Sequence, residues 1–239
     1  MRYALYFTPA EDHPLSQAAQ HWLGSDPFKG GVCPQAAVPG FLPEELRDLT
    51  ADPRRYGFHG TLKAPFELAP GKTEMQLLQA IDEFSAECEA FEIREMTLGQ
   101  LGPFFALVPS DACAALQMLA DETVRRFEPF RATLSDADIA RRKPEELTES
   151  GRRNLETWGY PYVFDEFRFH MTLTGKVPVE RRAAMRDALA ARFGAFVGQP
   201  LLIDAVALFV EPQRGAPFTV HSLLPLGGTS KRKMSRDDR

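Results

Sequence analysis

A five-residue motif occurs twice in this chain, as FHGTL at residues 58–62 and as FHMTL at residues 169–173. Both copies lie in runs typical of a β-strand, where successive side chains point to opposite faces. Each histidine therefore shares a strand face with the threonine two residues later. By composition, roughly one histidine in forty should be followed in this pattern by Ser or Thr and then an aliphatic residue. Two of the five histidines match, so the repeat indicates two equivalent strands.

The composition is that of an ordinary globular protein, long enough to bury a substantial core. Of the 239 residues, 44% are hydrophobic and 26% are charged. The formal net charge of -5 disfavours a long nucleic acid or an anionic membrane as a partner. The three cysteines form no C-x-x-C pair, which favours a reducing compartment, and no apolar run reaches the length of a transmembrane helix. We therefore expect a cytoplasmic protein with no membrane partner. The sequence leaves the oligomeric state open, with a monomer favoured.

The segments that follow the two motifs repeat the same order of elements. Each motif strand precedes a helix, a strand, a turn with the sequence Gly-Pro-Phe or Ala-Pro-Phe, and a further strand. We interpret this order as an internal duplication. The sequence thus predicts an α+β fold, a single bilobal domain over residues 1–229 whose two lobes are related by a pseudo-twofold axis. Each lobe should carry a mainly antiparallel sheet with helices on its outer face, and the motif strands should line a central groove.

The lobes are expected at about residues 1–103 and 104–229, with exchange of strands between them left open. A single α+β sheet with coincidental symmetry is the alternative. Residues 24–53 are rich in glycine and proline and should form an irregular loop with one helical turn at residues 44–49, whereas residues 135–158 form a polar insertion with helical spacing. The role of either segment does not follow from the sequence. The charged tail, residues 230–239, is predicted to be flexible.

The two histidines suit phosphodiester chemistry if the duplication brings His59 and His170 to one groove. Histidine titrates near neutrality, so one imidazole can take a proton from an attacking water or hydroxyl while the other gives one to the departing oxygen. The hydroxyls of Thr61 and Thr172 can donate hydrogen bonds to the non-bridging phosphate oxygens. This chemistry needs no metal, and which histidine is the acid stays open. A lone strand histidine is usually structural, but two at equivalent positions favour a site.

Four further residues are candidates for binding the substrate. Lys63 is expected on the strand face of the first motif histidine, and Arg168 on the face of the second. Tyr56 precedes the first motif, and Arg141 belongs to the basic run at residues 141–143 within the insertion. A solvated surface position is the alternative for the three charged residues. No P-loop, nucleophile-elbow or H-E-x-x-H motif competes with this interpretation.

HGTL at residues 59–62 and HMTL at residues 170–173 together resemble the 2H phosphoesterase superfamily, whose hallmark is a pair of H-x-[ST]-hydrophobic motifs. The resemblance extends through the order of elements over most of the chain. It implies a bilobal fold, metal-independent chemistry without a cofactor, and a 2',3'-cyclic phosphate or a related RNA-end phosphodiester as substrate. It also implies His59 and His170 as the acid and base, with the two motif threonines holding the phosphate.

RRYGFHGTLKAPF at residues 54–66 and WGYPY at residues 158–162 also resemble a group of uncharacterised proteins encoded beside phosphonate-degradation genes. This resemblance implies a small sugar cyclic phosphate, such as ribosyl 1,2-cyclic phosphate, as the substrate. The lack of overall basic charge sets the chain apart from RNA-processing members. We therefore expect a phosphodiesterase that hydrolyses a small cyclic phosphodiester. The alternative is a module that binds a phosphorylated ligand or an RNA end without chemistry.

Overall fold

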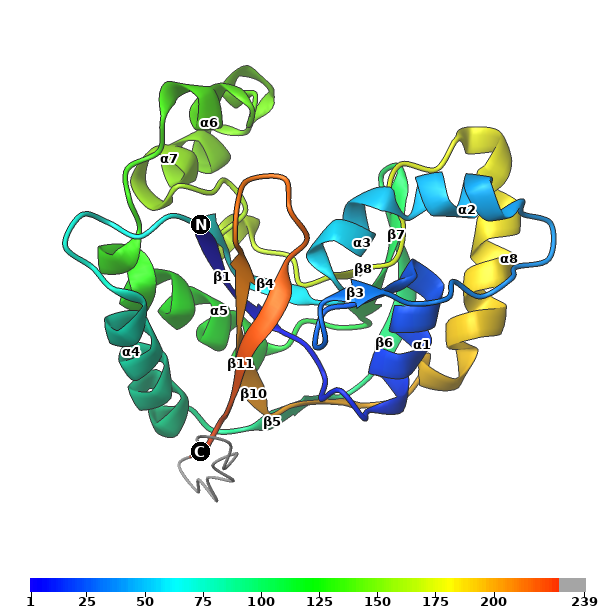
Figure 1. The fold of residues 1–239 in the computed structure, drawn as a ribbon, viewed down its shortest axis with the longest axis horizontal. Coiled ribbons are helices and arrows are strands. Elements are labelled where there is room, and N and C mark those ends of the chain that lie inside the picture. The colour runs from blue at the N-terminus through cyan, green and yellow to red at the C-terminus, as the bar shows by residue number, and fades with distance from the viewer. Residues whose placement is uncertain (228–239) are drawn as a thin grey trace.

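Seven antiparallel strands form one sheet through the centre of the molecule (Figure 1). The computed structural model describes residues 1–227. Neighbouring strands follow the order β11-β10-β1-β4-β8-β7-β6. These strands are β1 (Arg2–Phe7), β4 (Gly60–Phe66), β6 (Met96–Leu101), β7 (Phe104–Pro109), β8 (Met171–Thr172), β10 (Ala205–Glu211) and β11 (Thr219–Pro225).

Helices and two small antiparallel pairs complete the described part of the chain. The helices are α1 (Pro14–Leu23), α2 (Pro43–Leu49), α3 (Ala51–Tyr56), α4 (Glu74–Glu87), α5 (Ala114–Phe127), α6 (Asp136–Ala140), α7 (Glu149–Trp158) and α8 (Arg182–Phe193). The small pairs join β2 (Ser25–Asp26) to β3 (Gly31–Val32), and β5 (Phe91–Ile93) to β9 (Leu201–Ile203). The expected loop at 24–53 thus contains β2, β3 and α2, and the expected insertion at 135–158 contains α6 and α7.

The two motif strands are neighbours at the centre of the sheet, joined through the pair Gly60–Met171. From this pair outward, the strand order is β4-β1-β10-β11 on one side and β8-β7-β6 on the other. The predicted α+β bilobal architecture with antiparallel strands is confirmed. The lobe boundary near residue 103 stays a prediction; β10 and β11 pair beside β1 while β6 pairs with β7, which is the exchange of strands that the sequence left open. Each half of the sheet thus takes strands from both halves of the chain.

Alternating side chains give the sheet a helix-covered face and a face that carries the site. On β1, Tyr3, Leu5 and Phe7 belong to the main core. Tyr6, between them, belongs to a smaller buried cluster with Phe209 on the other face. In Figure 1, α4 and α5 lie beside the four-stranded half of the sheet, and α1 and α8 lie beside β6 and β7. Burial of apolar side chains under these helices stabilises the sheet.

A bulge in β4 overturns one sequence-based prediction. Tyr6 pairs with Thr61, but the next residue back, Leu5, pairs with Lys63, so Leu62 is an extra residue in the strand. Lys63 therefore turns to the helix-covered face, where it is buried. Its Nζ lies 2.9 Å from a carboxylate oxygen of Glu128 and donates to a backbone carbonyl of α5 at 3.1 Å. The prediction that Lys63 shares the face of the motif histidine is wrong.

Two further expectations concern the C-terminal tail and membrane-spanning helices. The predicted flexible tail, residues 230–239, lies outside the described residues. Among residues 1–227, no helix has both the length and the apolar character needed to span a membrane.

Candidate active site

The register of the motif strands brings both histidines and both threonines to one face. Gly60 lies opposite Met171 in an antiparallel pair. The same register, continued by one residue each way, sets His59 opposite Thr172 and Thr61 opposite His170. Directly opposed residues have Cβ atoms about 5 Å apart, and diagonal neighbours such as the two histidines about 7–8 Å apart. The four side chains therefore form a compact quartet with the imidazoles on one diagonal.

Each imidazole is oriented by a backbone carbonyl two residues earlier. The Nδ1 atom of His59 lies 2.9 Å from the Gly57 carbonyl oxygen, and that of His170 lies 2.7 Å from the Arg168 carbonyl oxygen. A carbonyl only accepts hydrogen bonds, so these contacts assign the N–H to Nδ1 in both rings. Gly57, whose carbonyl contacts the His59 ring, has a positive φ of 73°, which glycine adopts without steric strain. Nε2 of each histidine is thereby left as the atom that can accept or donate a proton.

Aromatic residues surround His59 and shift its titration. The Tyr6 ring stacks on the imidazole with centroids 3.8 Å apart, and the Tyr56 and Phe209 rings lie at 6.1 and 6.0 Å. Burial lowers the pKa of His59 from 6.5 to about 4; the bond to Gly57 opposes this shift, and the charge of His170 adds to it. Burial also lowers the pKa of His170, against the effect of its backbone hydrogen bond.

Close packing under the quartet explains the glycine of the first motif. A Cβ atom on Gly60 would lie 2.3 Å from Cε2 of Phe169, closer than atoms can approach without a shift. The Phe169 ring is buried and contacts Phe7 with centroids 6.3 Å apart. On the other face, the Thr61 hydroxyl lies 3.3 Å from Nε2 of His59. The absence of a side chain at position 60 therefore lets the two motif strands approach each other.

The two histidines open onto adjoining cavities that we call the histidine groove. One cavity, of about 380 Å³, is lined by His59 and Thr172 together with Tyr56 and Phe104. The second, of about 650 Å³, is lined by His170 and again by Phe104. Its other lining residues include Tyr160, Tyr162 and Arg168. Phe104 borders both cavities, and its ring lies 5.7 Å from that of His170, so the two cavities adjoin at Phe104.

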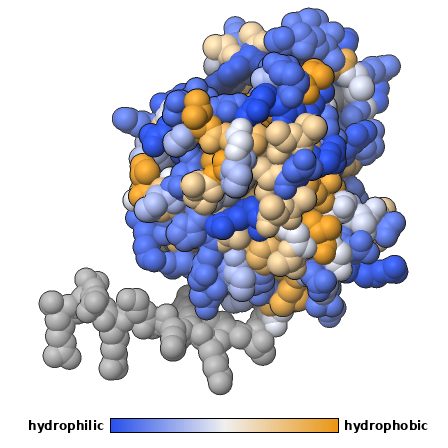
Figure 2. Space-filling view, turned by 90° about the vertical axis from the view of Figure 1, so that its right-hand side faces the viewer, coloured by the Kyte–Doolittle hydropathy of each residue, from blue (hydrophilic) through white to orange (hydrophobic). Residues whose placement is uncertain are grey.

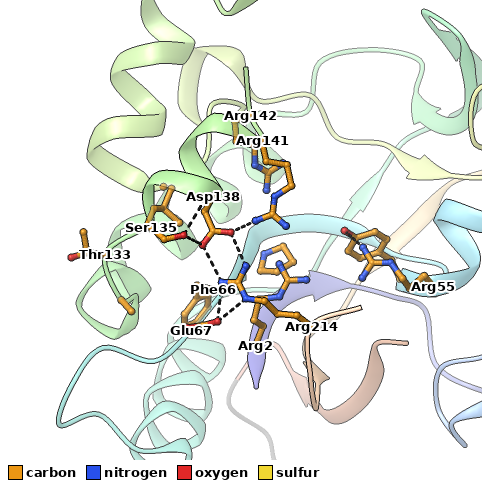
Figure 3. A pocket seen from close by; sticks show the side chains of 15 residues that line it. Arg2, Arg55, Phe66, Glu67, Thr133, Ser135, Asp138, Arg141, Arg142 and Arg214 are labelled. Atoms are coloured by element: carbon orange, nitrogen blue, oxygen red, sulfur yellow. Dashed lines mark hydrogen bonds and ion pairs between the residues drawn. The ribbon is translucent and has the colours of Figure 1, made fainter. Parts of the chain in front are cut away.

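A third cavity lies on the other side of Tyr56. It measures about 260 Å³, and Figure 3 shows arginine side chains around it. We call it the arginine pocket; its arginines are Arg2, Arg55, Arg141, Arg142 and Arg214. Tyr56 lines this pocket as well as the cavity of His59.

Figure 2 shows hydrophilic residues over most of one face of the molecule and a group of hydrophobic residues through its middle.

The structure brings most of the sequence-predicted residues near the histidines. Tyr56 and Arg168 line the histidine groove, whereas Arg141 lines the arginine pocket and Lys63 lies on the opposite face. Sequence reasoning missed Tyr6, which stacks on the first imidazole but looked like an ordinary core residue of an aromatic strand. It also missed the arginine pocket, because its members are distant in the sequence.

No group of three or more His, Cys, Asp or Glu side chains within residues 1–227 is arranged to hold a metal ion.

Residues 61–219 match the family described as "Protein of unknown function (DUF1045)". The chain belongs to this family. The sequence-based resemblance to an uncharacterised group is thereby confirmed, while the relation to the 2H phosphoesterases stands on the paired motifs.

Two curated proteins are similar to this DUF1045 chain over nearly its whole length. Both are named "Ribose 1,5-bisphosphate phosphokinase PhnN". The protein from Janthinobacterium sp. (strain Marseille) is 39% identical over 235 residues, covering 97% of this chain and 52% of its own length. The protein from Laribacter hongkongensis (strain HLHK9) is 32% identical over 243 residues, with coverages of 97% and 54%. The DUF1045 chain thus spans about half the length of these relatives.

Solved structures similar to this DUF1045 chain include TT0787 of Thermus thermophilus and E. coli LigT complexed with NADP+. The match to TT0787 has a TM-score of 0.47 and 16% sequence identity, and it covers 96% of this chain and 100% of the TT0787 chain. The match to LigT has a TM-score of 0.45 and 14% identity, with coverages of 95% and 97%. At TM-scores below 0.5, neither likeness carries information about the chemistry of this chain.

Proposed function

We propose that this chain is a metal-independent phosphodiesterase of the 2H type, which hydrolyses a small cyclic phosphodiester with His59 and His170 as its proton-transfer groups. The observation that carries the proposal is the pairing of Gly60 with Met171, because it sets two imidazoles and two hydroxyls around one space. Diagonal neighbours on paired strands typically lie about 7–8 Å apart, with their Cβ atoms somewhat closer, and this spacing leaves room for one phosphate group between the two imidazoles. General acid–base catalysis requires this kind of opposed placement.

In the proposed reaction, a water molecule attacks the phosphorus of the cyclic diester. Nε2 of one histidine takes the proton of this water as the new P–O bond forms. The bond from phosphorus to one ring oxygen breaks, and Nε2–H of the other histidine gives that oxygen its proton. The products are a phosphate monoester and a free hydroxyl group. Thr61 and Thr172 donate hydrogen bonds to the non-bridging oxygens, where negative charge increases in the transition state.

The environments of the imidazoles favour His59 as the base. Its pKa, lowered to about 4 by burial, keeps the ring neutral over most of the pH range, so that Nε2 carries a lone pair. His170 is then the acid. Its pKa is also lowered by burial, but a bound phosphate anion would raise it, because an opposite charge nearby stabilises the imidazolium.

The proposed substrate is a phosphorylated ribose such as ribosyl 1,2-cyclic phosphate, with a 2',3'-cyclic nucleotide as the second class to test. The curated relatives are named for ribose 1,5-bisphosphate and carry the PhnN name, which belongs with the phosphonate genes. The kinase activity in that name is not proposed for this chain, which lacks a G-x-x-x-x-G-K-[ST] sequence and spans about half of the relatives. A cavity of about 380 Å³ at His59 suits a small substrate.

The test is hydrolysis of a panel of cyclic phosphates in the presence of EDTA. His59→Ala and His170→Ala should each lower kcat by at least about a hundredfold, the usual contribution of general acid–base catalysis. His221→Ala is the matched control, because His221 is an exposed β11 residue near Ser222 and Glu74. Equal hydrolysis by the parent and both motif variants would refute the mechanism.

The same panel separates an enzyme from a binding module. A ligand that raises the melting temperature by mass action, without any turnover by the parent protein, would identify the module instead.

A further inference from the structure

The arginine pocket gathers cationic side chains from distant parts of the fold. Arg2 begins β1, Arg55 lies in α3, Arg141 and Arg142 follow α6, and Arg214 lies between β10 and β11. Figure 3 shows their side chains around one space. Guanidinium groups match the geometry of phosphate oxygens and can bind them in pairs of hydrogen bonds. Five of them at one small cavity indicate a site for an anion.

Buried carboxylates hold several of these guanidinium groups in place. Glu211 is fully buried and accepts hydrogen bonds from Arg2 and from Arg55, the latter at 2.8 Å. Asp138, also buried, accepts two from Arg214, at 2.7 and 3.0 Å. Burial alone would raise the pKa of the Glu211 carboxyl, but its hydrogen bonds and the arginine charges lower it, so it stays ionised. The arginines are therefore positioned before any ligand binds.

The pocket keeps an excess of positive charge after these pairs are formed. Three carboxylates, Glu67, Asp138 and Glu211, pair with its arginines, which leaves two of the five positive charges over. Arg142 lies over the Tyr160 ring, 4.8 Å from its centroid, rather than against a carboxylate. A dianionic group would complete this arrangement.

Tyr56 belongs to the linings of both the arginine pocket and the cavity of His59. The Tyr56 ring lies 6.1 Å from the His59 ring and lines both cavities. The guanidinium carbon of Arg55 lies 4.2 Å from the centroid of the same Tyr56 ring. The arginine pocket and the cavity of His59 therefore adjoin at Tyr56.

The cavity of His59 has a different chemical character. Its walls include Pro53, Pro103 and Phe104, and its described lining contains Lys176 but no arginine. The anion that the arginines attract is thus not the phosphodiester between the histidines, which would lie on the other side of Tyr56.

We propose that the arginine pocket binds a second phosphate, a monoester on the same molecule whose cyclic diester lies between the histidines. This inference rests on the proposed function and narrows its substrate class to cyclic phosphodiesters that carry a phosphomonoester. At about 260 Å³ the pocket suits one phosphate group rather than a nucleobase or a longer chain. Its arginines act as binding and positioning residues, because they lie away from the reacting atoms.

The test compares two substrates that differ only in this group, ribose 1,2-cyclic phosphate with and without a 5-phosphate. The parent protein should hydrolyse the 5-phosphorylated compound with a kcat/KM at least about tenfold higher, mainly through a lower KM. The double variant Arg141→Gln with Arg142→Gln should lose this preference. Arg153→Gln is the matched control, because Arg153 is exposed in the neighbouring α7 and pairs with Glu149. Equal kcat/KM for both compounds with the parent would overturn the inference.

A binding measurement keeps this result separate from the proposed function. If the parent hydrolyses neither compound, the proposed reaction fails for this substrate class. Calorimetric binding of ribose 5-phosphate then tests whether the arginine pocket binds a phosphomonoester. Binding to the parent and to Arg153→Gln, with loss of binding in the double variant, supports the inference. Absence of binding to the parent would overturn it.

Discussion

Gly60 of the first motif pairs in register with Met171 of the second, and this contact makes one site out of two sequence repeats. Because the strands are antiparallel, each histidine lies opposite the threonine of the other motif. The two inward-facing residues, Gly60 and Met171, are buried against the core, so the packing beneath the quartet sets its geometry.

Substitution of Gly60 tests that packing. Gly60→Ala should lower the free energy of unfolding by about 1–3 kcal/mol, because the new methyl group would overlap the Phe169 ring. It should also lower kcat, because the movement that relieves this overlap would separate the two motif strands. Urea unfolding followed by circular dichroism measures the first effect. Gly194→Ala is the control: position 194 has helical φ and ψ with open space around it, so stability should stay the same or rise slightly.

Lys63 offers a second test, of the corrected face assignment. Lys63→Met should leave kcat/KM close to that of the parent, because the ammonium group lies on the helix-covered face. Glu128→Ala should instead destabilise the fold by about 3 kcal/mol, since it leaves a buried ammonium without its carboxylate. A large loss of turnover in Lys63→Met, in protein of normal stability, would return Lys63 to the site.

Periodicity in the sequence was enough to predict the shared face of each His-Thr pair and the α+β class. It failed for Lys63, because the extra residue in β4 at Leu62 reverses the alternation, and a bulge has no reliable local signature. The duplicated order of elements was visible, but the partner of each strand was not. Pairing of β10 with β1 joins residues about two hundred positions apart, which only the packed fold determines.

The arginine pocket could not be predicted from the sequence for a similar reason. Arg141 was visible as part of a basic run, whereas Arg2 and Arg214 carried no local signal. Their convergence depends on buried carboxylates, Glu211 and Asp138, at positions where a sequence pattern gives no reason to expect an ion pair.

Burial of His59 predicts a dependence of stability on pH. The pKa of His59 is lowered to about 4 in the folded protein, against 6.5 for the free side chain. Between these values the unfolded chain binds a proton that the folded protein does not, so the free energy of unfolding should fall as the pH is lowered from about 6.5 to about 4. The contribution is at most about 3 kcal/mol. His59→Gln should show a smaller decrease over this window; identical pH profiles for the two proteins would contradict the shift.

The two histidines also predict the pH profile of the proposed reaction. With His59 as base, kcat/KM should rise with pH through a value near 4, where its imidazole becomes neutral. With His170 as acid, kcat/KM should fall again as the pH rises through the pKa of His170, which burial holds below 6.5, because the imidazolium that must donate the proton is then lost. The optimum should therefore lie between about pH 4 and 6.5.

The substrate for this measurement is a cyclic diester without a monoester group, because its own charge is constant over this range. Both sides of the pH profile then report pKa values of the free enzyme. An optimum above neutral pH would show that neither histidine titrates as its surroundings require, and the assignment of base and acid would have to be abandoned.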